Sequence, residues 1–349
     1  MGKILVTGGL GYIGSHTSLL LLENNYEIIV LDSIVNSSED TLKKIIHTAK
    51  LKKINIKEKI KFIKGDIRDS RLLESLFNKQ NDDRIEAVIH FAGYKSVRES
   101  VQFPLKYWEN NVFGSLKLFE AMEKGNCQTI VFSSSATIYG YVNKIGLKET
   151  DPINPINPYG KTKATIELLL DDLYKSSRNK WRVVNLRYFN PVGAHHLGIL
   201  GEEPLGEPNN IFPLLLKAVN QNQNNFQVFG DDWPTPDGTC LRDYIHVEDL
   251  ADGHLAALKK LFSLDSAYFN INLGRGKATS VLELINEFEK ANKIKIPFSI
   301  SDKREGDVPI LVADINLANE ILAWVPKRNL SDVCIDGFNW MKKNYKYFN

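Results

Sequence analysis

Cysteine is scarce in this sequence: its 349 residues include three, Cys127, Cys240 and Cys334. Their wide spacing provides neither a disulfide framework nor the paired ligands of a zinc site, so we expect no bound metal and a reducing, cytoplasmic compartment. Long apolar runs are absent too, and no signal region precedes the first predicted strand. Because no run reaches the roughly 20 residues that span a bilayer, we expect no membrane partner.

An excess of charge of either sign is also lacking. The 44 Lys and Arg residues nearly balance the 42 Asp and Glu residues, for a net charge of +2, so we expect no nucleic-acid partner. One stretch, residues 43–64, is locally basic, with nine lysines against one acid. It lacks the interleaved aromatic side chains that stack on bases, which favours a solvated surface insertion over a nucleic-acid site.

The sequence does contain a regular alternation of short apolar runs and helical segments. Strands are predicted over residues 3–7, 27–31, 60–63, 87–91, 129–132 and 182–186. This rhythm is typical of an α/β fold with a doubly wound parallel sheet. After residue 190 the sequence becomes rich in Gly, Pro and Asn. We therefore predict a sheet domain over residues 1–188 and a smaller α/β lobe over residues 189–349, with a segment around residues 239–272 returning to the sheet domain.

Three glycines, Gly8, Gly11 and Gly14, lie between the first strand and a helix predicted over residues 15–23. In such a turn the first glycine permits a tight bend, the second lets the backbone approach a pyrophosphate, and the third allows close helix packing. The next strand ends at Asp32, 18 residues after Gly14, close to the spacing at which a carboxylate binds the adenine ribose. Such a carboxylate repels a 2′-phosphate. The pattern predicts a Rossmann site for NAD rather than NADP, the alternative being that Asp32 only ends a strand.

A second motif, Tyr159 with Lys163 four residues later, lies on one face of a helix predicted to begin after Pro158. A free tyrosine titrates near 10, so a tyrosine base near pH 7 needs its pKa lowered by roughly 3 units, or about 4 kcal/mol. A lysine about 5 Å away supplies roughly 3 kcal/mol at an effective dielectric constant near 20, so the cationic ring of NAD⁺ must add to it. Alone, the pair could be an ordinary surface helix. Beside the glycine turn, it indicates hydride transfer at an alcohol or ketone carbon.

These motifs, together with the segment Ser133-Ser134-Ser135-Ala136-Thr137-Ile138-Tyr139-Gly140, resemble the extended short-chain dehydrogenase/reductase family. Within it, the chain resembles the UDP-galactose 4-epimerases (UDP-glucose 4-epimerases) over nearly its whole length. The segments that carry this resemblance are residues 90–93, 186–191, 193–195, 208–210, 238–239, 242–246 and 304–307. The resemblance implies reversible epimerisation of UDP-galactose and UDP-glucose at C4, through a 4-keto intermediate and tightly bound NAD, in galactose metabolism. It also implies a homodimer.

The resemblance further assigns roles to individual positions. Tyr159 would accept and donate the proton, Lys163 would anchor the cofactor ribose and tune Tyr159, and Ser135 would hydrogen-bond the reacting oxygen. The expected cofactor-binding residues are Gly8, Gly11, Tyr12, Ile13, Gly14, Asp32, Ser33, Asn36, Ser37, Asp66, Ile67, Phe91, Ala92, Gly93, Lys95, Asn110, Ser135, Tyr159, Lys163 and Phe189. The expected substrate-binding residues are Ser135, Tyr159, Asn190, Asn210, Ile211, Phe229, Arg242, Arg304 and Leu311.

The two arginines also make sense without the resemblance, because a pyrophosphate offers oxygens suited to bidentate guanidinium contacts. The alternative is that Arg242 and Arg304 form surface ion pairs with Asp243 and Asp307. Leu311 stands where members restricted to glucose and galactose carry tyrosine and members that accept N-acetylhexosamines carry a small residue. We therefore expect weaker activity on UDP-N-acetylhexosamines.

The chain departs from the family pattern at Ser33, and two rival functions are compatible with the fold. Ser33 stands where the family usually places asparagine, which removes one expected polar contact to the adenine ribose. A nucleotide-sugar 4,6-dehydratase carries an Asp-Glu pair just after the strand-end serine or threonine, where this chain has Ala136 and Thr137. A non-enzymatic NAD-sensing regulator commonly loses the Tyr or Lys, and both are kept here. The sequence favours the epimerase over both rivals.

Overall fold

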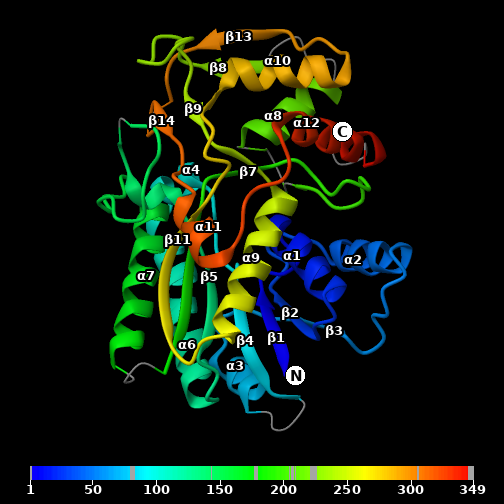
Figure 1. Ribbon diagram of the computed structural model, residues 1–349, viewed down its shortest axis with the longest axis vertical. Coiled ribbons are helices and arrows are strands. Elements are labelled where there is room, and N and C mark those ends of the chain that lie inside the picture. Colours follow the sequence, from blue (N-terminus) through cyan, green and yellow to red (C-terminus); the bar gives the residue numbers. More distant parts are fainter. Residues whose placement is uncertain are drawn as a thin grey trace.

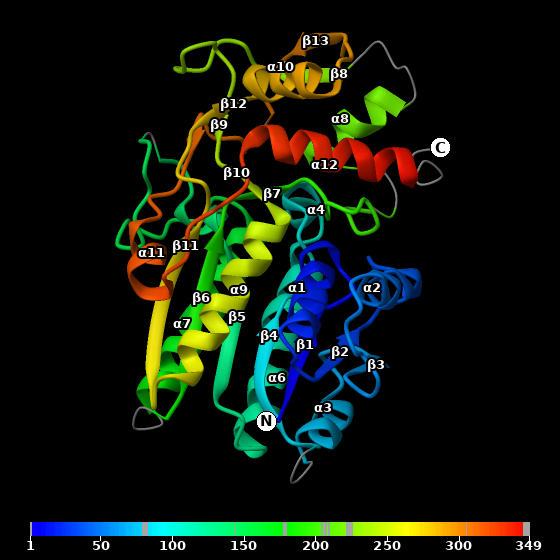
Figure 2. The ribbon, with the colours of Figure 1, turned by 45° about the vertical axis from the view of Figure 1, so that its right-hand side comes forward.

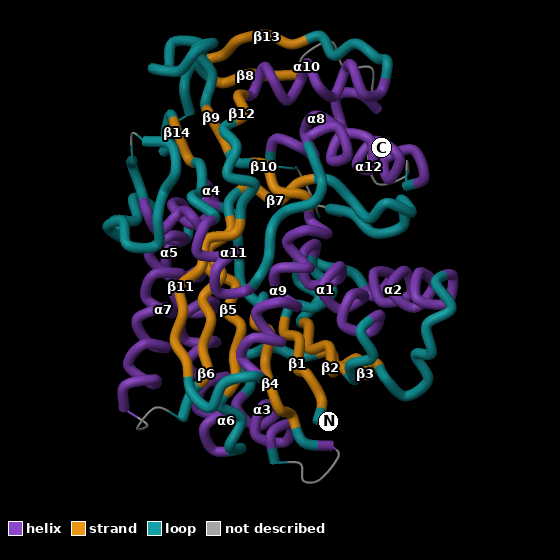
Figure 3. The backbone as a smooth tube through the Cα atoms, in the orientation of Figure 1, coloured by secondary structure: helices purple, strands orange, loops and turns teal. Residues whose placement is uncertain are grey.

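The computed structural model of the protein describes residues 2–78, 83–142, 144–176, 180–203, 205, 208, 210–220, 226–304 and 306–344. Its centre is a seven-stranded parallel sheet with the order β11-β6-β5-β4-β1-β2-β3 (Figures 1 and 3). The strands are β1 (Lys3–Thr7), β2 (Ile28–Asp32), β3 (Ile60–Lys64), β4 (Ile85–His90), β5 (Thr129–Ser135), β6 (Arg182–Tyr188) and β11 (Ala267–Leu273). The predicted fold class is confirmed, and six of these strands match predicted ones with small shifts at their ends.

Helices cover both faces of this sheet, because successive strand side chains point to opposite sides. Ile4 and Val6 of β1 belong to the core cluster on one face, and Leu5 belongs to the cluster on the other. The first face carries α1 (Tyr12–Glu23), α2 (Glu39–Leu51), α9 (Val247–Phe262) and α11 (Asn316–Leu322). The second carries α3 (Ser70–Phe77), α4 (Val97–Gln102), α5 (Pro104–Tyr107), the π-helix η2 (Trp108–Phe113), α6 (Gly114–Lys124) and α7 (Pro158–Ser176).

A smaller group of elements lies beyond the carboxyl ends of the sheet strands (Figure 2). Its helices are α8 (Ile211–Asn220), α10 (Val281–Asn292) and α12 (Leu330–Lys343). Its short strands are β7 (Asn190–Val192), β8 (Phe226–Phe229), β9 (Leu241–Arg242), β10 (Tyr244–His246), β12 (Thr279–Ser280), β13 (Phe298–Ser301) and β14 (Ile310–Leu311). Phe212, Phe288 and Trp340 help to form a separate core there. The predicted domain limits at residues 188 and 189 remain a prediction, although β11, from the late part of the chain, pairs with β6 in the main sheet.

The lysine-rich stretch that was expected to be a solvated insertion is in part a docked helix. Ser38 caps the start of α2 by accepting a hydrogen bond from the backbone of Asp40. Ile45, Thr48 and Ala49 are buried on one side of α2, which packs on α1. This spacing of three and four residues puts them on one helix face. The first part of the lysine-rich stretch thus contains a buried helix face that packs on α1, and it is not a solvated insertion throughout.

Among the described residues, no helix combines the length and the apolar content that crossing a membrane requires.

Candidate active site

The glycine turn joins β1 to α1, and two of its glycines are required by the protein itself. Gly8 has a φ of +68°, and a Cβ added to it would lie 2.7 Å from the backbone nitrogen of Ala92. A Cβ on Gly14 would lie 2.3 Å from the carbonyl oxygen of Gly8. A Cβ on Gly11 would meet nothing nearer than that same oxygen, at 3.3 Å. Gly11 is therefore the least crowded of the three glycines within the described residues, and it leaves the most room for close approach of a pyrophosphate.

The start of α1 also suits an anion. Gly11 is its N-cap residue, with no side-chain hydrogen bond to the helix and no acidic residue in the first turn. The first backbone N–H groups and the positive end of the helix dipole can therefore face a phosphate. The strand order reverses between β1 and β4, where open α/β sheets bind their ligands. These features fit a dinucleotide such as NAD.

Asp32 lies at the end of β2 and is buried. One carboxylate oxygen accepts a hydrogen bond from the backbone of Leu10 at 3.0 Å. The other accepts from the backbone of Ile34 at 2.8 Å and from the hydroxyl of Ser37 at 2.7 Å. Asp32 thus connects the glycine turn to the segment after β2. It does more than end a strand, and its contact with a ribose remains a prediction.

The other predicted cofactor residues lie after neighbouring strands or in nearby helices. Tyr12 and Ile13 begin α1, Ser33, Asn36 and Ser37 follow β2, Asp66 and Ile67 follow β3, Phe91, Ala92, Gly93 and Lys95 follow β4, Asn110 lies in η2, and Phe189 follows β6. Asp66 is held by Arg68, whose Nη2 lies 2.7 Å from Asp66 Oδ2, and this pairing lowers the pKa of Asp66. The strand ends therefore bring the predicted set to one edge of the sheet.

Ser135, Tyr159 and Lys163 meet at the end of β5. Ser135 is the last residue of that strand, and the other two lie one turn apart on α7. Lys163 Nζ donates a hydrogen bond to the carbonyl oxygen of Ser133 at 2.7 Å and lies 5.9 Å from the centre of the Tyr159 ring. All three predicted catalytic side chains are buried.

The protein alone does not make Tyr159 a base. Burial raises the pKa of Tyr159 to about 12, and a hydrogen bond with Ser135 acts in the opposite direction. Burial also lowers the pKa of Lys163 to about 7, which the negative charge of Glu167 partly offsets. Desolvation of the phenolate is the largest influence on the pKa of Tyr159, and the lowering expected from Lys163 and NAD⁺ together remains a prediction. Ionising Tyr159 near pH 7 therefore needs a second positive charge, such as that of NAD⁺, more than the sequence alone suggested.

A buried ion pair that sequence reasoning missed supports this strand end. Arg187 Nη2 lies 2.6 Å from Glu167 Oε2, and both side chains are almost fully buried. Ser134, between the two serines named above, donates its hydroxyl proton to Glu167 Oε1. Glu167 lies one helical turn after Lys163, so the regular spacing of Tyr159, Lys163 and Glu167 was a signal that could have found it.

On the substrate side, Asn190 begins β7 and its backbone N–H donates to the carbonyl of Asp243 at 3.0 Å. Its side-chain Oδ1 is buried and has no hydrogen-bond partner within the described ranges. A buried polar atom without a partner is costly, and a bound ligand can satisfy it. Asn190 Oδ1 can therefore accept a hydrogen bond from a ligand, and its binding of the substrate remains a prediction.

Arg242 and Arg304 have different surroundings. Arg242 Nη1 donates to the carbonyl of Val308 at 2.7 Å, and Nη2 lies 3.6 Å from Asp307 Oδ1. Arg242 thus forms the alternative ion pair with Asp307, but not one with Asp243 among the described contacts. Arg304 is exposed, and its guanidinium carbon lies 3.7 Å from the centre of the Phe229 ring. Both arginines keep donors that a pyrophosphate could use.

Leu311 lies beside the catalytic end of β5. It stands opposite Arg242 where β14 pairs with β9. It also packs against a buried cluster that includes Ala136 and Phe189. Its position next to both the catalytic strand end and a predicted phosphate ligand is consistent with contact to the sugar.

Glu202 was not predicted, and it joins two predicted sets. Its Oε1 accepts a hydrogen bond from Lys95 Nζ at 2.6 Å and from Asn210 Nδ2 at 3.0 Å. Lys95 was assigned to the cofactor, and Asn210, just before Ile211 at the start of α8, to the substrate. No local sequence pattern marks Glu202, because its partner Lys95 is 107 residues away.

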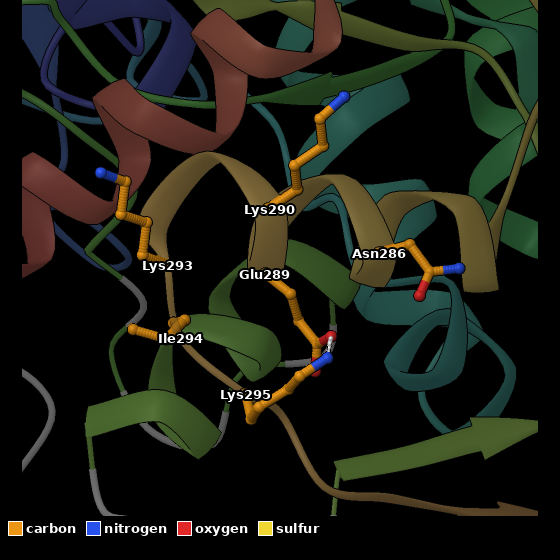
Figure 4. A pocket seen from close by; sticks show the side chains of 6 residues that line it. All are labelled: Asn286, Glu289, Lys290, Lys293, Ile294 and Lys295. Atoms are coloured by element: carbon orange, nitrogen blue, oxygen red, sulfur yellow. Dashed lines mark hydrogen bonds and ion pairs between the residues drawn. The ribbon is translucent and has the colours of Figure 1, made fainter.

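A hollow on the outer surface of the small lobe lies apart from these residues (Figure 4). Lys290, Lys293 and Lys295 surround it, and Lys295 pairs with Glu289 at 2.8 Å. It contains no predicted site residue, and its lysines are surface groups.

Comparison with known proteins gives consistent matches over the whole chain. A family model described as GDP-mannose 4,6 dehydratase matches residues 5–336. The chain is 45% identical over 342 residues to UDP-glucose 4-epimerase 2 of Arabidopsis thaliana, covering 98% of this chain and 95% of the relative. It is 46% identical over 341 residues to UDP-glucose 4-epimerase of Bacillus subtilis, covering 98% and 97%.

Solved structures match equally well. UDP-glucose-4-epimerase from Stenotrophomonas maltophila, crystallised with NAD and formylated UDP-arabinopyranose, superimposes with a TM-score of 0.93, at 39% identity and 99% coverage of both chains. UDP-glucose 4-epimerase from Bifidobacterium longum, in complex with NAD⁺ and UDP, gives a TM-score of 0.91, at 41% identity and 99% coverage of both chains.

The doubly wound sheet, the glycine turn and the Ser135, Tyr159 and Lys163 group define an enzyme of the extended short-chain dehydrogenase/reductase class. Within that class, the chain belongs to the UDP-glucose 4-epimerase family. The family model is described by a dehydratase, but it represents a wider group that also includes the epimerases. Ala136 and Thr137 provide no carboxyl group where a dehydratase needs its acid and base.

Proposed function

We propose that the protein interconverts UDP-galactose and UDP-glucose by inverting C4 of the sugar, with NAD bound throughout. The observation that carries this proposal is the meeting of Ser135, Tyr159 and Lys163 at the end of β5, at the same edge of the sheet as the glycine turn. A site that binds a dinucleotide and a proton-transfer tyrosine together supports reversible oxidation of an alcohol.

NAD would be held by the start of α1, by Asp32 and by the residues after β3 and β4. When bound, it supplies a hydride acceptor that takes hydride from C4 and later returns it. Lys163 and the cationic nicotinamide ring would together favour the ionised form of Tyr159, whose pKa is about 12 in the protein alone. Ser135 would hydrogen-bond the sugar oxygen and keep it facing Tyr159.

Each turnover uses Tyr159 twice. It first removes the proton from the 4′-hydroxyl as hydride leaves C4, which gives a 4-keto sugar. The keto sugar turns about its pyrophosphate linkage and presents its other face. Tyr159 then returns the proton as hydride is added back, so C4 is inverted. Binding energy for this cycle would come mainly from the nucleotide and pyrophosphate, held by Asn190, Arg242 and Arg304.

We also propose weaker activity on UDP-N-acetylhexosamines. Leu311 has no ring or hydroxyl, so it leaves more room than tyrosine, and its branched end still crowds an acetamido group. One related structure, from Campylobacter jejuni, is named a UDP-Glc/GlcNAc 4-epimerase and is 33% identical to this chain with a TM-score of 0.81.

A homodimer, a cytoplasmic location and a role in galactose metabolism remain part of the proposal. The dimer is supported by apolar side chains exposed on neighbouring helices of one face of the sheet, namely Val101, Phe103, Leu105, Phe113 and Leu168. The three cysteines are buried and unpaired, which suits a reducing compartment.

The proposed function is tested by incubating the purified protein with UDP-galactose and measuring UDP-glucose, without added reductant. We expect conversion in both directions, and denaturation should release a nucleotide with the absorbance of NAD⁺ or NADH. Release of NADP, or a strict need for a stoichiometric external reductant, would contradict the proposal. A dehydratase would instead form a 4-keto-6-deoxy sugar.

A further inference from the structure

One carboxylate lies between the two halves of the candidate site. Glu202 belongs to the loop between β7 and α8, and its side chain is 10% exposed. One of its oxygens, Oε1, accepts hydrogen bonds from both Lys95 and Asn210. A cation assigned to the cofactor and an amide assigned to the UDP-sugar are therefore held by the same atom.

A third site residue faces the same carboxylate. The pKa of Tyr12, at the start of α1, is raised mainly by burial and further by the negative charge of Glu202. The hydroxyl of Tyr12 donates to the carbonyl of Gly193 at 2.7 Å, near the beginning of the same loop. Tyr12 thus contacts the loop at its beginning, and Lys95 contacts it at Glu202, about midway along.

The physical chemistry of this arrangement favours a positioning role over a stabilising one. Lys95 is more than half exposed, so its ion pair with Glu202 contributes little to folding. An ionised carboxylate near bound phosphate groups would be repulsive unless a cation accompanied it, and Lys95 is the cation that pairs with Glu202. Charge-assisted hydrogen bonds from two donors to one oxygen also fix the directions of both donors.

We propose that Glu202 is a positioning residue that couples the cofactor to the UDP-sugar, an inference that rests on the proposed function. Glu202 holds the ammonium group of Lys95 where NAD binds and the amide of Asn210 where the UDP-sugar binds. NAD bound against Lys95 therefore fixes, through Glu202, the direction of the Asn210 amide that receives the sugar nucleotide.

The next residue supplies a matched control. Glu203 lies in the same loop, but its carboxylate pairs with Lys44 on α2, away from Lys95 and Asn210. Substituting Glu203 by glutamine removes one negative charge from the same loop. Substituting Glu202 by glutamine removes the charge that faces the site. The two variants therefore separate loss of loop charge from loss of the shared acceptor.

The test measures UDP binding by calorimetry in protein saturated with added NAD. The variants are Glu202→Gln, Lys95→Met, their double mutant and Glu203→Gln. We expect Glu202→Gln and Lys95→Met each to weaken UDP binding by about tenfold, within the usual range of coupling between sites. The double mutant should be no weaker than either single one, since both act through one contact. Glu203→Gln should bind UDP as the unaltered protein does.

Three results would overturn the inference. The first is unchanged UDP affinity in Glu202→Gln, and the second is a double mutant in which the two losses of affinity add. The third is an equal loss of UDP affinity in Glu203→Gln, which would show that the charge of the loop alone matters. If the unaltered protein saturated with NAD binds no UDP, the proposed function fails instead. The two failures are thus distinguishable.

Discussion

The cofactor half of the site and the sugar half obtain their shapes in different ways. The glycine turn is fixed by backbone contacts so close that Gly8 and Gly14 have no room for a side chain. The sugar side is made of side chains on short strands and loops. Arg304 stacks on the ring of Phe229. The side-chain Oδ1 of Asn190 has no hydrogen-bond partner in the part of the chain that is described. Changes in the first half should therefore affect folding and cofactor retention, whereas changes in the second should affect which sugar is accepted.

The largest effect should come from the residue at the boundary of the two halves. Tyr159→Phe removes the proton acceptor and keeps the ring, so kcat should fall by about 10²- to 10⁴-fold, the usual contribution of general acid–base catalysis. UDP affinity and NAD content, measured by calorimetry and by absorbance after denaturation, should stay nearly the same. Ser135→Ala should also be strongly impaired. Near-normal turnover of Tyr159→Phe would refute the role given to this tyrosine.

The same substitution at two glycines of the turn should have different effects on folding. Gly14→Ala places a Cβ against the Gly8 carbonyl, so it should destabilise the fold by roughly 1 to 3 kcal/mol and abolish NAD retention. Gly11→Ala places its Cβ 3.3 Å from the same oxygen, a milder contact, so it should destabilise the fold less than Gly14→Ala, measured against unaltered protein freed of NAD, while NAD retention is lost. Both are checked by thermal unfolding and NAD content. If Gly11→Ala retains NAD fully, the face at Gly11 does not receive the pyrophosphate.

On the sugar side, Leu311 should change specificity without changing the fold. A few apolar atoms in a pocket are worth roughly 1 to 3 kcal/mol, or about 10- to 200-fold in specificity. Leu311→Tyr should suppress turnover of UDP-N-acetylhexosamines selectively, and Leu311→Cys should raise it. The ratio of kcat/KM for the two substrate classes is the measurement. Equal effects on both classes would show that Leu311 does not gate the pocket.

Acid stability depends on His254, which packs against Phe91 in the cofactor half. Burial lowers the pKa of His254 to about 4, so below about 6.5 the unfolded chain binds a proton that the folded protein does not. Stability is therefore lost as the pH falls from about 6.5 to 4, by about 1.4 kcal/mol per pH unit. His254→Gln should flatten this part of the stability profile, and the same change at the exposed His47 should not. Parallel profiles for both variants would contradict the buried neutral state of His254.

Sequence reasoning recovered what local patterns encode. Apolar runs predicted six strands of the sheet, and the glycine spacing placed Gly8, Gly11 and Gly14 at the turn between β1 and α1. The four-residue spacing of Tyr159 and Lys163 placed them on one face of α7. The structure brings both of these groups to the same edge of the sheet.

What the sequence could not supply are contacts between distant segments and the balance of solvation. Glu202 meets Lys95 only because the loop after β7 folds back over the sheet, and Arg187 finds Glu167 only when β6 lies beside α7. The shift of the Lys163 pKa to about 7 depends on burial. The spacing of charged residues along the sequence does not reveal how much water surrounds each of them in the folded protein.

The proposed mechanism requires that hydride leaves C4 and returns to C4 of the same sugar. It is tested most directly with UDP-galactose that carries deuterium at C4, incubated with the NAD-loaded protein in ordinary water. The proposed mechanism predicts UDP-glucose that retains the deuterium at C4, read by mass spectrometry and proton NMR. UDP-glucose with the label lost to water, or no UDP-glucose at all, would contradict it.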